Sequence, residues 1–252
     1  MKKIIVAQNV IKTFEEEQEK NRVLNDVSLF IEEGEFVSVM GPSGSGKSTL
    51  LYALSGMDRV DEGQIYFGDM ELSKMTEKEL SRLRLTKMGF VFQQAAMLKN
   101  LNLLDNIILP SIHENKKNAK HILEKARSLM EQLGIGELIN RDITKVSGGQ
   151  LQRAGICRAL LNHPQIIFGD EPTGALNSQS AEEIMNIFKI INEDGTTIML
   201  VTHDAKVAAR TKRVLYMQDG MIVAEQKLSK YNGKNLKERV SAVTNKLREI
   251  GI

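Results

Sequence analysis

The segment GPSGSGKST, residues 41–49, stands between the apolar run EFVSVM and the leucine-rich run LLYALSG. The first run has the β-branched and aromatic residues typical of a strand, and the second is typical of a helix. The segment fits the pattern G-x-x-x-x-G-K-[ST] in full, and a strand before it and a helix after it are the context that this pattern requires. A glycine-serine turn that contains a lysine by chance would not need that context. The segment therefore predicts a phosphate-binding loop in an α/β fold.

The residue types of this loop suit a nucleotide. Glycines let successive backbone N–H groups approach a phosphate chain without a Cβ in the way. A helix that begins at about Lys47 would direct the positive end of its dipole at the same anion. Lys47 supplies a cation for the β- and γ-phosphates, and the Ser48 hydroxyl is suited to bind Mg²⁺. We expect the whole loop to contact the nucleotide, namely Gly41, Pro42, Ser43, Gly44, Ser45, Gly46, Lys47, Ser48 and Thr49.

An apolar run that ends in acidic residues, IIFGDEP, occurs later in the chain. A buried strand that ends at Asp170 would place this carboxylate beside Mg²⁺, usually through water. The adjacent Glu171 is suited to polarise an attacking water as a general base. The pair indicates hydrolysis rather than transfer to a second substrate. The alternative is that the two acidic residues cap the next helix.

A second glycine-rich motif, VSGGQ at residues 146–150, precedes the apparent helix QLQRAGICRALL. Serine and glycine residues at a helix N-terminus form an anion site. One chain would then carry two half-sites for a phosphate, and two copies that face each other would complete both. The motif therefore indicates an assembly of two copies.

In this order the motifs resemble the ATP-binding subunit of ABC transporters, over nearly the whole chain. The resemblance rests on GPSGSGKS (Walker A), Gln93 (Q-loop), VSGGQ (signature), IIFGDE (Walker B), GALN (D-loop) and His203 (switch histidine). It implies a homodimer in the ATP-bound state, with each nucleotide between Lys47 of one copy and Ser147 and Gly149 of the other. The signature residues expected to bind this nucleotide are Ser147, Gly148, Gly149 and Gln150.

The resemblance also assigns roles around the phosphates. Gln93 follows the apparent strand GFVF, and its amide can reach Mg²⁺ or the attacking water. His203, at the end of the run IMLVTH, is expected to hydrogen-bond the γ-phosphate. Catalysis is thus assigned to Glu171, His203 and Gln93, and Mg²⁺ binding to Ser48, Gln93 and Asp170.

Two further positions carry expectations. Phe14, in IKTFEEE, is placed like the family's aromatic residue that stacks on adenine; the alternative is an ordinary core phenylalanine. Asn177 departs from the family, whose D-loop normally has Asp at this place. Because Asn caps a helix about as well as Asp does, we expect Asn177 to begin the helix SQSAEEIM. The missing negative charge is expected to slow hydrolysis without abolishing it.

The rest of the chain alternates apparent strands with helices, which predicts a mostly parallel sheet. With the resemblance, this predicts an α/β fold: a P-loop NTPase (RecA-like) core, an N-terminal antiparallel β part and an inserted helical subdomain. We expect a single nucleotide-binding domain over residues 1–252, with its core at about 1–93 and 165–230. The helical subdomain is expected at about 94–164 and a C-terminal helical tail at about 231–252. The tail is amphipathic and is expected to pack on this domain or on a partner.

Composition and charge narrow the possible partners. The net charge of +2 is too small an excess to indicate nucleic acid. The sequence contains no run of about 18 apolar residues, which is the length needed to span a bilayer. We therefore expect a cytoplasmic, peripheral chain that is held on the inner face of the cell membrane by an integral-membrane permease. The lone cysteine, Cys157, lies in an apolar helical stretch and is expected to be a packing residue.

Finer resemblance, in MGFVFQQ, DNIILP and DEPTGAL, is to the branch that serves lipoprotein release, macrolide export and antimicrobial-peptide resistance. The length and the tail resemble most the peptide-resistance (bacitracin-export type) members. The alternatives are the motor of a cell-division-type ABC complex, which does not transport, and a soluble ABC ATPase that acts on nucleic acid. The long heptad insertions and the second cassette typical of that soluble class are absent from this sequence.

The segment AAMLKNLNLLDNIILP carries more apolar residues than a solvated loop needs. Leu104, Ile107 and Ile108 are as well explained by packing inside the helical subdomain as by exposure. Met97 and Leu98 are expected to be free, and to receive a short cytoplasmic helix of the permease.

Overall fold

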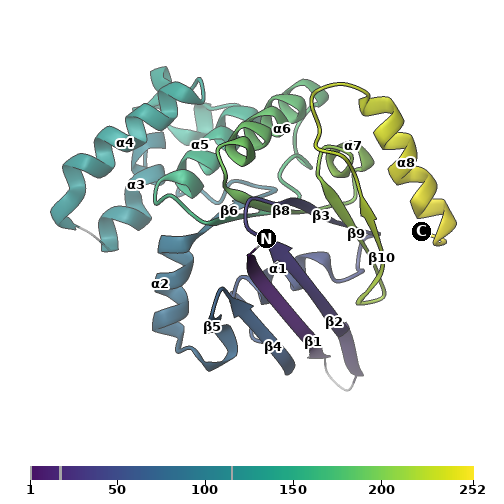
Figure 1. The fold of residues 1–252 in the computed structure, drawn as a ribbon. Coiled ribbons are helices and arrows are strands. Elements are labelled where there is room, and N and C mark those ends of the chain that lie inside the picture. The colour runs from purple at the N-terminus through teal and green to yellow at the C-terminus, as the bar shows by residue number, and fades with distance from the viewer. Residues whose placement is uncertain (1, 17–18, 115) are drawn as a thin grey trace.

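The computed structural model describes residues 2–16, 19–114 and 116–252. Its centre is a six-stranded sheet with the order β10-β9-β3-β8-β7-β6 (Figure 1). All pairs in this sheet are parallel except β9 with β10, so the predicted mostly parallel sheet is confirmed. Its strands are β3 (Phe36–Met40), β6 (Met88–Phe92), β7 (Ile166–Asp170), β8 (Thr197–Thr202), β9 (Arg213–Gln218) and β10 (Met221–Lys227). Since β3 and β8 are buried along their whole length, their sequences are nearly continuous apolar runs.

The N-terminal part forms a second, antiparallel sheet with the order β2-β1-β4-β5. Its strands are β1 (Lys3–Glu16), β2 (Glu19–Glu32), β4 (Glu62–Phe67) and β5 (Met70–Glu71). Helix α1 (Lys47–Leu54) lies between the two sheets, as Figure 1 shows. Its Leu50, Leu51 and Leu54 are fully buried in a cluster with apolar residues of both sheets. Burial of these leucines fixes the orientation of α1, and with it the loop before α1.

The segment between β6 and β7 folds into helices α3 (Leu103–Glu114), α4 (Ala119–Gln132) and α5 (Gly148–Leu160), with 3-10 turns at Lys116–Asn118, Gly136–Leu138 and Ile143–Lys145. The apolar faces of these helices form a core of their own, in which Leu104, Ile107 and Ile108 are buried. Packing, rather than exposure, therefore accounts for these three residues. Cys157 is buried in the same core, and burial raises the pKa of its thiol to about 12, as expected for a packing residue. The residue numbers at which core and helical subdomain divide stay a prediction.

The other helices are α2 (Glu77–Lys87), α6 (Ser178–Glu193), α7 (Ala205–Ala208) and α8 (Leu236–Glu249), and a 3-10 turn lies at Leu72–Lys74. Helix α6 buries Ile184 and Phe188 against the central sheet. In the tail, Val243 of α8 is fully buried in a cluster with Ala208 of α7 and Tyr216 of β9. The tail thus packs on this domain. Within residues 2–16, 19–114 and 116–252, no helix has both the length and the apolarity to cross a membrane.

The strand order brings distant parts of the chain to one edge of the central sheet. Strands β3, β8, β7 and β6 are neighbours, and all run in the same direction. The loop 41–46, His203, Asp170 and Gln93 therefore lie together at the carboxyl ends of these strands. In open α/β sheets this edge is where ligands bind.

Candidate nucleotide-binding and catalytic site

The loop before α1 is tightly enclosed by its surroundings. A Cβ on Gly46 would lie 2.6 Å from the backbone oxygen of Val23, and a Cβ on Gly41 would collide with that of Met217. Gly46 also has a φ of 97°, and it caps α1 without any side-chain hydrogen bond. The buried Ser45 Oγ has no hydrogen-bond partner among the described residues. Uncapped helix N–H groups beside an unpartnered hydroxyl are the features that an oxyanion would satisfy.

Lys47 begins α1 and is only 8% exposed. Its Nζ donates to the backbone oxygen of Pro42 at 2.7 Å. Burial lowers the pKa of this ammonium, and the nearby carboxylates of Glu171 and Asp170 oppose that effect. An ammonium has three N–H donors, so this lysine keeps donor capacity for a phosphate.

Asp170, the last residue of β7, is held by two hydroxyl groups of α1. Ser48 Oγ donates to one carboxylate oxygen at 2.8 Å, and the Tyr52 hydroxyl donates to the other at 2.7 Å. The predicted proximity of Ser48 and Asp170 is therefore seen. Sequence reasoning missed Tyr52, although its position one helical turn after Ser48 places both on the same face of α1.

The residues present fit Mg²⁺ as part of a nucleotide complex. No cluster of three or more His, Cys, Asp or Glu side chains with metal-ligand geometry occurs in the described part of the chain. Mg²⁺ requires no such cage, because it keeps several waters and binds through one or two carboxylates together with substrate phosphates. The hard oxygen atoms of Ser48 and Asp170, which lie side by side, suit this cation.

Glu171 and His203 form a pair at the ends of β7 and β8. His203 Nδ1 lies 2.8 Å from Glu171 Oε1. The Glu171 side chain is mostly buried, whereas that of His203 is 64% exposed. Glu171 has a φ of 46°, a strained value for a non-glycine residue, and its N–H donates to the backbone oxygen of Val201 at 3.0 Å. Tertiary contacts therefore fix this carboxylate.

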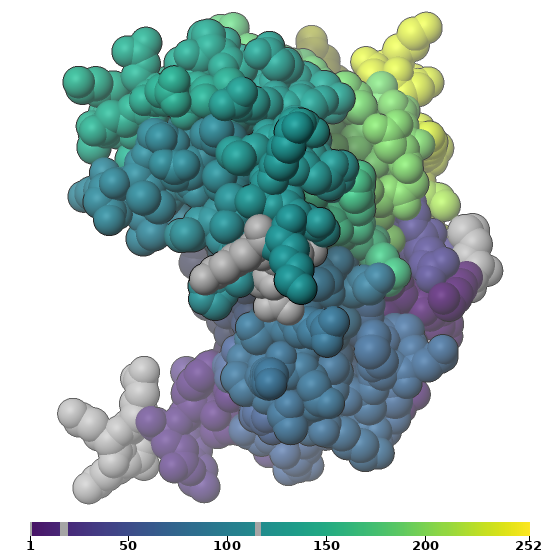
Figure 2. Space-filling model, turned by 90° about the vertical axis from the view of Figure 1, so that its left-hand side faces the viewer, coloured from purple at the N-terminus to yellow at the C-terminus, as the bar shows by residue number. Residues whose placement is uncertain are grey.

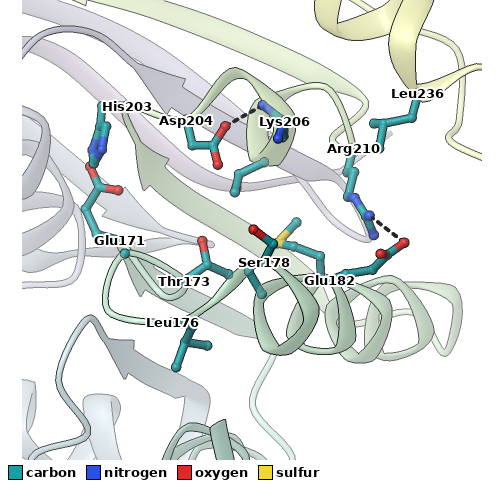
Figure 3. A pocket seen from close by; sticks show the side chains of 14 residues that line it. Glu171, Thr173, Leu176, Ser178, Glu182, His203, Asp204, Lys206, Arg210 and Leu236 are labelled. Carbon is teal, nitrogen blue, oxygen red and sulfur yellow. Dashed lines mark hydrogen bonds and ion pairs between the residues drawn. The ribbon is translucent and has the colours of Figure 1, made fainter. Parts of the chain in front are cut away.

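The Glu171–His203 pair opens onto a cleft of about 420 Å³ between α6, α7 and the start of α8. Figure 3 shows the two side chains at one end of this cleft and an ion pair of Arg210 with Glu182 at the other. Asp204 caps α7 by accepting a hydrogen bond from the Lys206 N–H at 2.7 Å. This cap fixes the turn that follows His203.

Gln93 is exposed and follows β6 directly. Its side chain lies over Gly174, where an added Cβ would be 2.9 Å from Gln93 Nε2. The N–H of Gly174 donates to the backbone oxygen of Glu171 at 2.9 Å. The structure therefore brings Gln93 to the turn that carries Glu171.

The motif at residues 147–150 forms the first turn of α5. Ser147 Oγ accepts from the N–H of Gln150, and the Gln150 side chain accepts from the N–H of Ser147, which together make a capping box. Ser147 and Gly148 are exposed. An added Cβ on Gly148 would lie 3.5 Å from Leu176, and one on Gly149 would lie 3.0 Å from Ser180 Oγ. The motif thus lies beside the D-loop segment, away from the residues that enclose the loop 41–46.

Asn177 begins α6, and its side-chain oxygen accepts from the N–H of Ser180 at 2.9 Å. The predicted cap is confirmed. Phe14 is 40% exposed on β1, and Lys12 Nζ lies 5.1 Å from the centre of its ring. This exposure contradicts the alternative of a core phenylalanine and leaves a ring face that a flat base can contact.

The parallel sheet, the glycine-rich loop before α1 and the acidic end of β7 define a P-loop ATPase. The family model described as ABC transporter matches residues 24–174. The chain belongs to this family as an ATP-binding, ATP-hydrolysing subunit.

Relatives agree with this assignment. The chain is 42% identical over 225 residues to the lipoprotein-releasing system ATP-binding protein LolD of Aquifex aeolicus, which covers 89% of this chain and 98% of LolD. It is 40% identical over 222 residues to the macrolide export ATP-binding/permease protein MacB of Aggregatibacter actinomycetemcomitans, covering 88% of this chain and 34% of MacB.

A solved structure shows the same fold. The ATP-binding cassette MJ0796 of Methanocaldococcus jannaschii, in a dimeric post-hydrolysis state bound to ADP and Pi, is 40% identical and superposes with a TM-score of 0.77. The match covers 90% of this chain and all of that one. The predicted fold class is thereby confirmed.

Proposed function

We propose that this chain is a motor subunit that binds ATP between two copies of itself and drives a separate membrane permease. The observation that carries the proposal is the edge of the central sheet. There the uncapped N-terminus of α1, the Ser48–Asp170 pair and the Glu171–His203 pair lie together. The exposed first turn of α5 supplies the second half of a shared site.

In this proposal the residues of the loop 41–49 bind the phosphates through backbone N–H groups, and Lys47 contributes the cation. Ser48, Asp170 and Gln93 would hold Mg²⁺, which neutralises phosphate charge when it is bound. Phe14 stacks on the adenine. The lowered pKa of Lys47 reflects its burial, and a phosphate chain would favour its charged form.

Hydrolysis is assigned to the Glu171–His203 pair with Gln93. Glu171 accepts a proton from the attacking water, since its carboxylate is fixed by the strained backbone and by the contact with His203. His203 orients Glu171 and donates a hydrogen bond toward the γ-phosphate. Gln93, held over Gly174, orients the water.

We further propose a head-to-tail homodimer in the ATP-bound state. Ser147, Gly148, Gly149 and Gln150 of one copy contact the nucleotide held by Lys47 of the other. The exposure of this turn supports the proposal, and so does the dimeric structure of MJ0796. An anion at the N-terminus of a 13-residue helix is favoured by the helix dipole.

The permease is proposed to dock in a groove of about 300 Å³ between α2, β6, α3 and α5. Met57, Phe90 and Pro110 contribute apolar surface to it, and Arg84 and Arg158 contribute positive charge. Figure 2 looks at this side of the molecule and shows a notch between the upper, helical lobe and the lower lobe. A chain docked there would be peripheral on the cytoplasmic face of the membrane.

Only one of the two side chains expected to receive the permease is fully available. Leu98 is 51% exposed, although it is not among the residues that line the groove. Met97 is half-buried against the helical core, and Arg158 Nη1 contacts its sulfur at 3.7 Å. The expectation that Met97 is free was wrong, because the flexible thioether fills a gap in that core.

For the cargo we propose export or removal of a lipid-type substrate, a drug or an antimicrobial peptide. The names of LolD and MacB support the first two, and the motifs of the bacitracin-export type support the third. A non-transporting cell-division-type complex is the second candidate. A role on nucleic acid is disfavoured by the net charge of +2.

The proposal is tested by co-expressing the chain with any membrane permease that a neighbouring reading frame is found to encode. We expect the two to co-purify, and transport or resistance in cells to depend on ATP hydrolysis by this chain. The Lys47→Ala variant is the control that should co-purify without supporting transport. A chain that hydrolyses ATP but binds no permease would contradict the motor assignment.

A further inference from the structure

Helix α1 presents two hydroxyl groups to one carboxylate. Ser48 lies in the first turn of α1 and Tyr52 in the next, and they hydrogen-bond to the two different oxygens of Asp170, at 2.8 and 2.7 Å. Residues four apart in a helix share a face. Asp170 ends β7, so these two bonds join the phosphate-binding helix to the acidic strand end.

The hydroxyl groups of Ser48 and Tyr52 differ in their other proposed roles. The Ser48 oxygen is the group proposed to face Mg²⁺, so this hydroxyl would have two tasks: its proton bonds to Asp170 and a lone pair serves the cation. Tyr52 is half-buried, with its ring packed against the main core cluster. The Tyr52 hydroxyl therefore has Asp170 as its one acceptor among the described residues.

We propose that Tyr52 is a positioning residue for ATP hydrolysis: it holds one oxygen of Asp170 so that the other faces the metal position beside Ser48. The inference rests on the proposed function of this site. A carboxylate without this tether can turn about its side-chain bonds, and ordering it would then oppose metal binding. Partners that orient a metal ligand typically change metal affinity by about 10- to 100-fold when they are removed.

The test replaces Tyr52 by Phe, which keeps the ring and removes only the hydroxyl. Binding of a fluorescent ATP analogue is measured in EDTA and across a Mg²⁺ titration. We expect unchanged affinity in EDTA, because the loop and Lys47 are intact, and an approximately tenfold higher Mg²⁺ requirement. Tyr66→Phe is the matched control, since the Tyr66 hydroxyl contacts Gln64 instead. It should leave both measurements unchanged.

Dependence on Asp170 is tested by combining variants. If Tyr52 acts through this carboxylate, Tyr52→Phe adds nothing to the Mg²⁺ requirement of an Asp170→Ala chain. An additive effect there, an unchanged Mg²⁺ requirement of the single variant, or an equal loss of affinity in EDTA would each overturn the inference. If the wild-type chain itself bound no nucleotide, the proposed function would fail, whereas wild-type behaviour of Tyr52→Phe alone would remove only this inference.

Discussion

Two helix N-termini of this chain, at Lys47 in α1 and at Gly148 in α5, are proposed to bind phosphate, and they are built differently. The first turn of α1 has no side-chain cap, and it is enclosed by residues of β2 and β9. The first turn of α5 is exposed and is capped by its own Ser147 and Gln150. The surroundings of the first N-terminus come from distant segments of the chain. The N–H groups of the second are capped by residues of the same turn.

The difference shows how a single chain can keep an incomplete site without loss of stability. The enclosed N-terminus of α1 has neighbours from several elements, so its polar groups are held in place before a nucleotide arrives. An exposed turn with vacant N–H groups would be solvated or capped, and a capping box is worth about 1 kcal/mol. In the proposed dimer, a nucleotide on the facing copy would therefore replace or extend this cap. The dimer is thus expected only when ATP is present.

The largest expected effect comes from removing the chemistry at the enclosed site. Glu171→Gln keeps the shape and removes the proposed base, so turnover should fall by at least about a hundredfold while nucleotide affinity is kept. Phosphate release and nucleotide binding are the measurements. Lys47→Ala is the contrasting control, because it should lose affinity itself. Hydrolysis by Glu171→Gln at the parent rate would show that another group is the base.

The next effect isolates the exposed site. Ser147→Arg, added to Glu171→Gln, places a bulky cation where the phosphate of the facing copy must fit. We expect the ATP-dependent dimer to disappear in light scattering, while binding at Lys47 stays mostly intact. Ser128→Arg, on the exposed side of α4 in the same subdomain, should still dimerise. A dimer without nucleotide, or one that survives Ser147→Arg, would contradict the shared site.

A smaller effect on the motor, with a large one on the partner, is expected at the docking groove. Met57→Asp adds a charge to an apolar side chain that is 40% exposed and lines the groove, so ATPase activity should stay within about twofold while co-purification with the permease falls. Ile190→Asp is the matched control, because Ile190 is 58% exposed on α6, outside the groove. Wild-type binding and transport by Met57→Asp would remove the groove as the docking site.

The smallest effect concerns the D-loop, which lies beside the exposed site. Asn177→Asp restores the charge usual in the family and keeps the cap of α6, so turnover should rise by no more than a few-fold at unchanged stability. Asn177→Ala should instead lower the melting temperature, since capping is worth about 1 kcal/mol. Steady-state ATPase assays and thermal melts separate the two effects. Lower turnover in Asn177→Asp would show that the amide is needed.

Most of the correct predictions concern secondary structure and helix caps, which depend on short stretches of sequence. The strand, loop and helix around residues 41–49, the strand that ends at Asp170 and the caps at Ser147 and Asn177 all depend on neighbouring residues in the chain. Short-range hydrogen bonds and apolar periodicity determine such features, so a single sequence suffices to find them.

Side-chain contacts between different helices and strands could not be predicted from short stretches of sequence. Tyr52 looked like one more residue of an apolar helix, and Met97 looked free. Their partners, Asp170 and Arg158, come from distant parts of the chain. Only the packing of α1 on β7, and of α5 on the segment after β6, decides which of these side chains meet.

The sequence by itself determined the phosphate loop and the acidic strand end, because each is a short motif of consecutive residues. It also determined the fold class, because the alternation of strand and helix patterns and the order of the motifs can be seen along the chain. The tertiary structure alone decided that Glu171 and His203 touch, that Gln93 lies over Gly174 and that two hydroxyls hold Asp170. Each of these contacts requires parallel strands from separate segments to end at one edge. Their register is set by the burial of apolar side chains throughout the core, which no single motif contains.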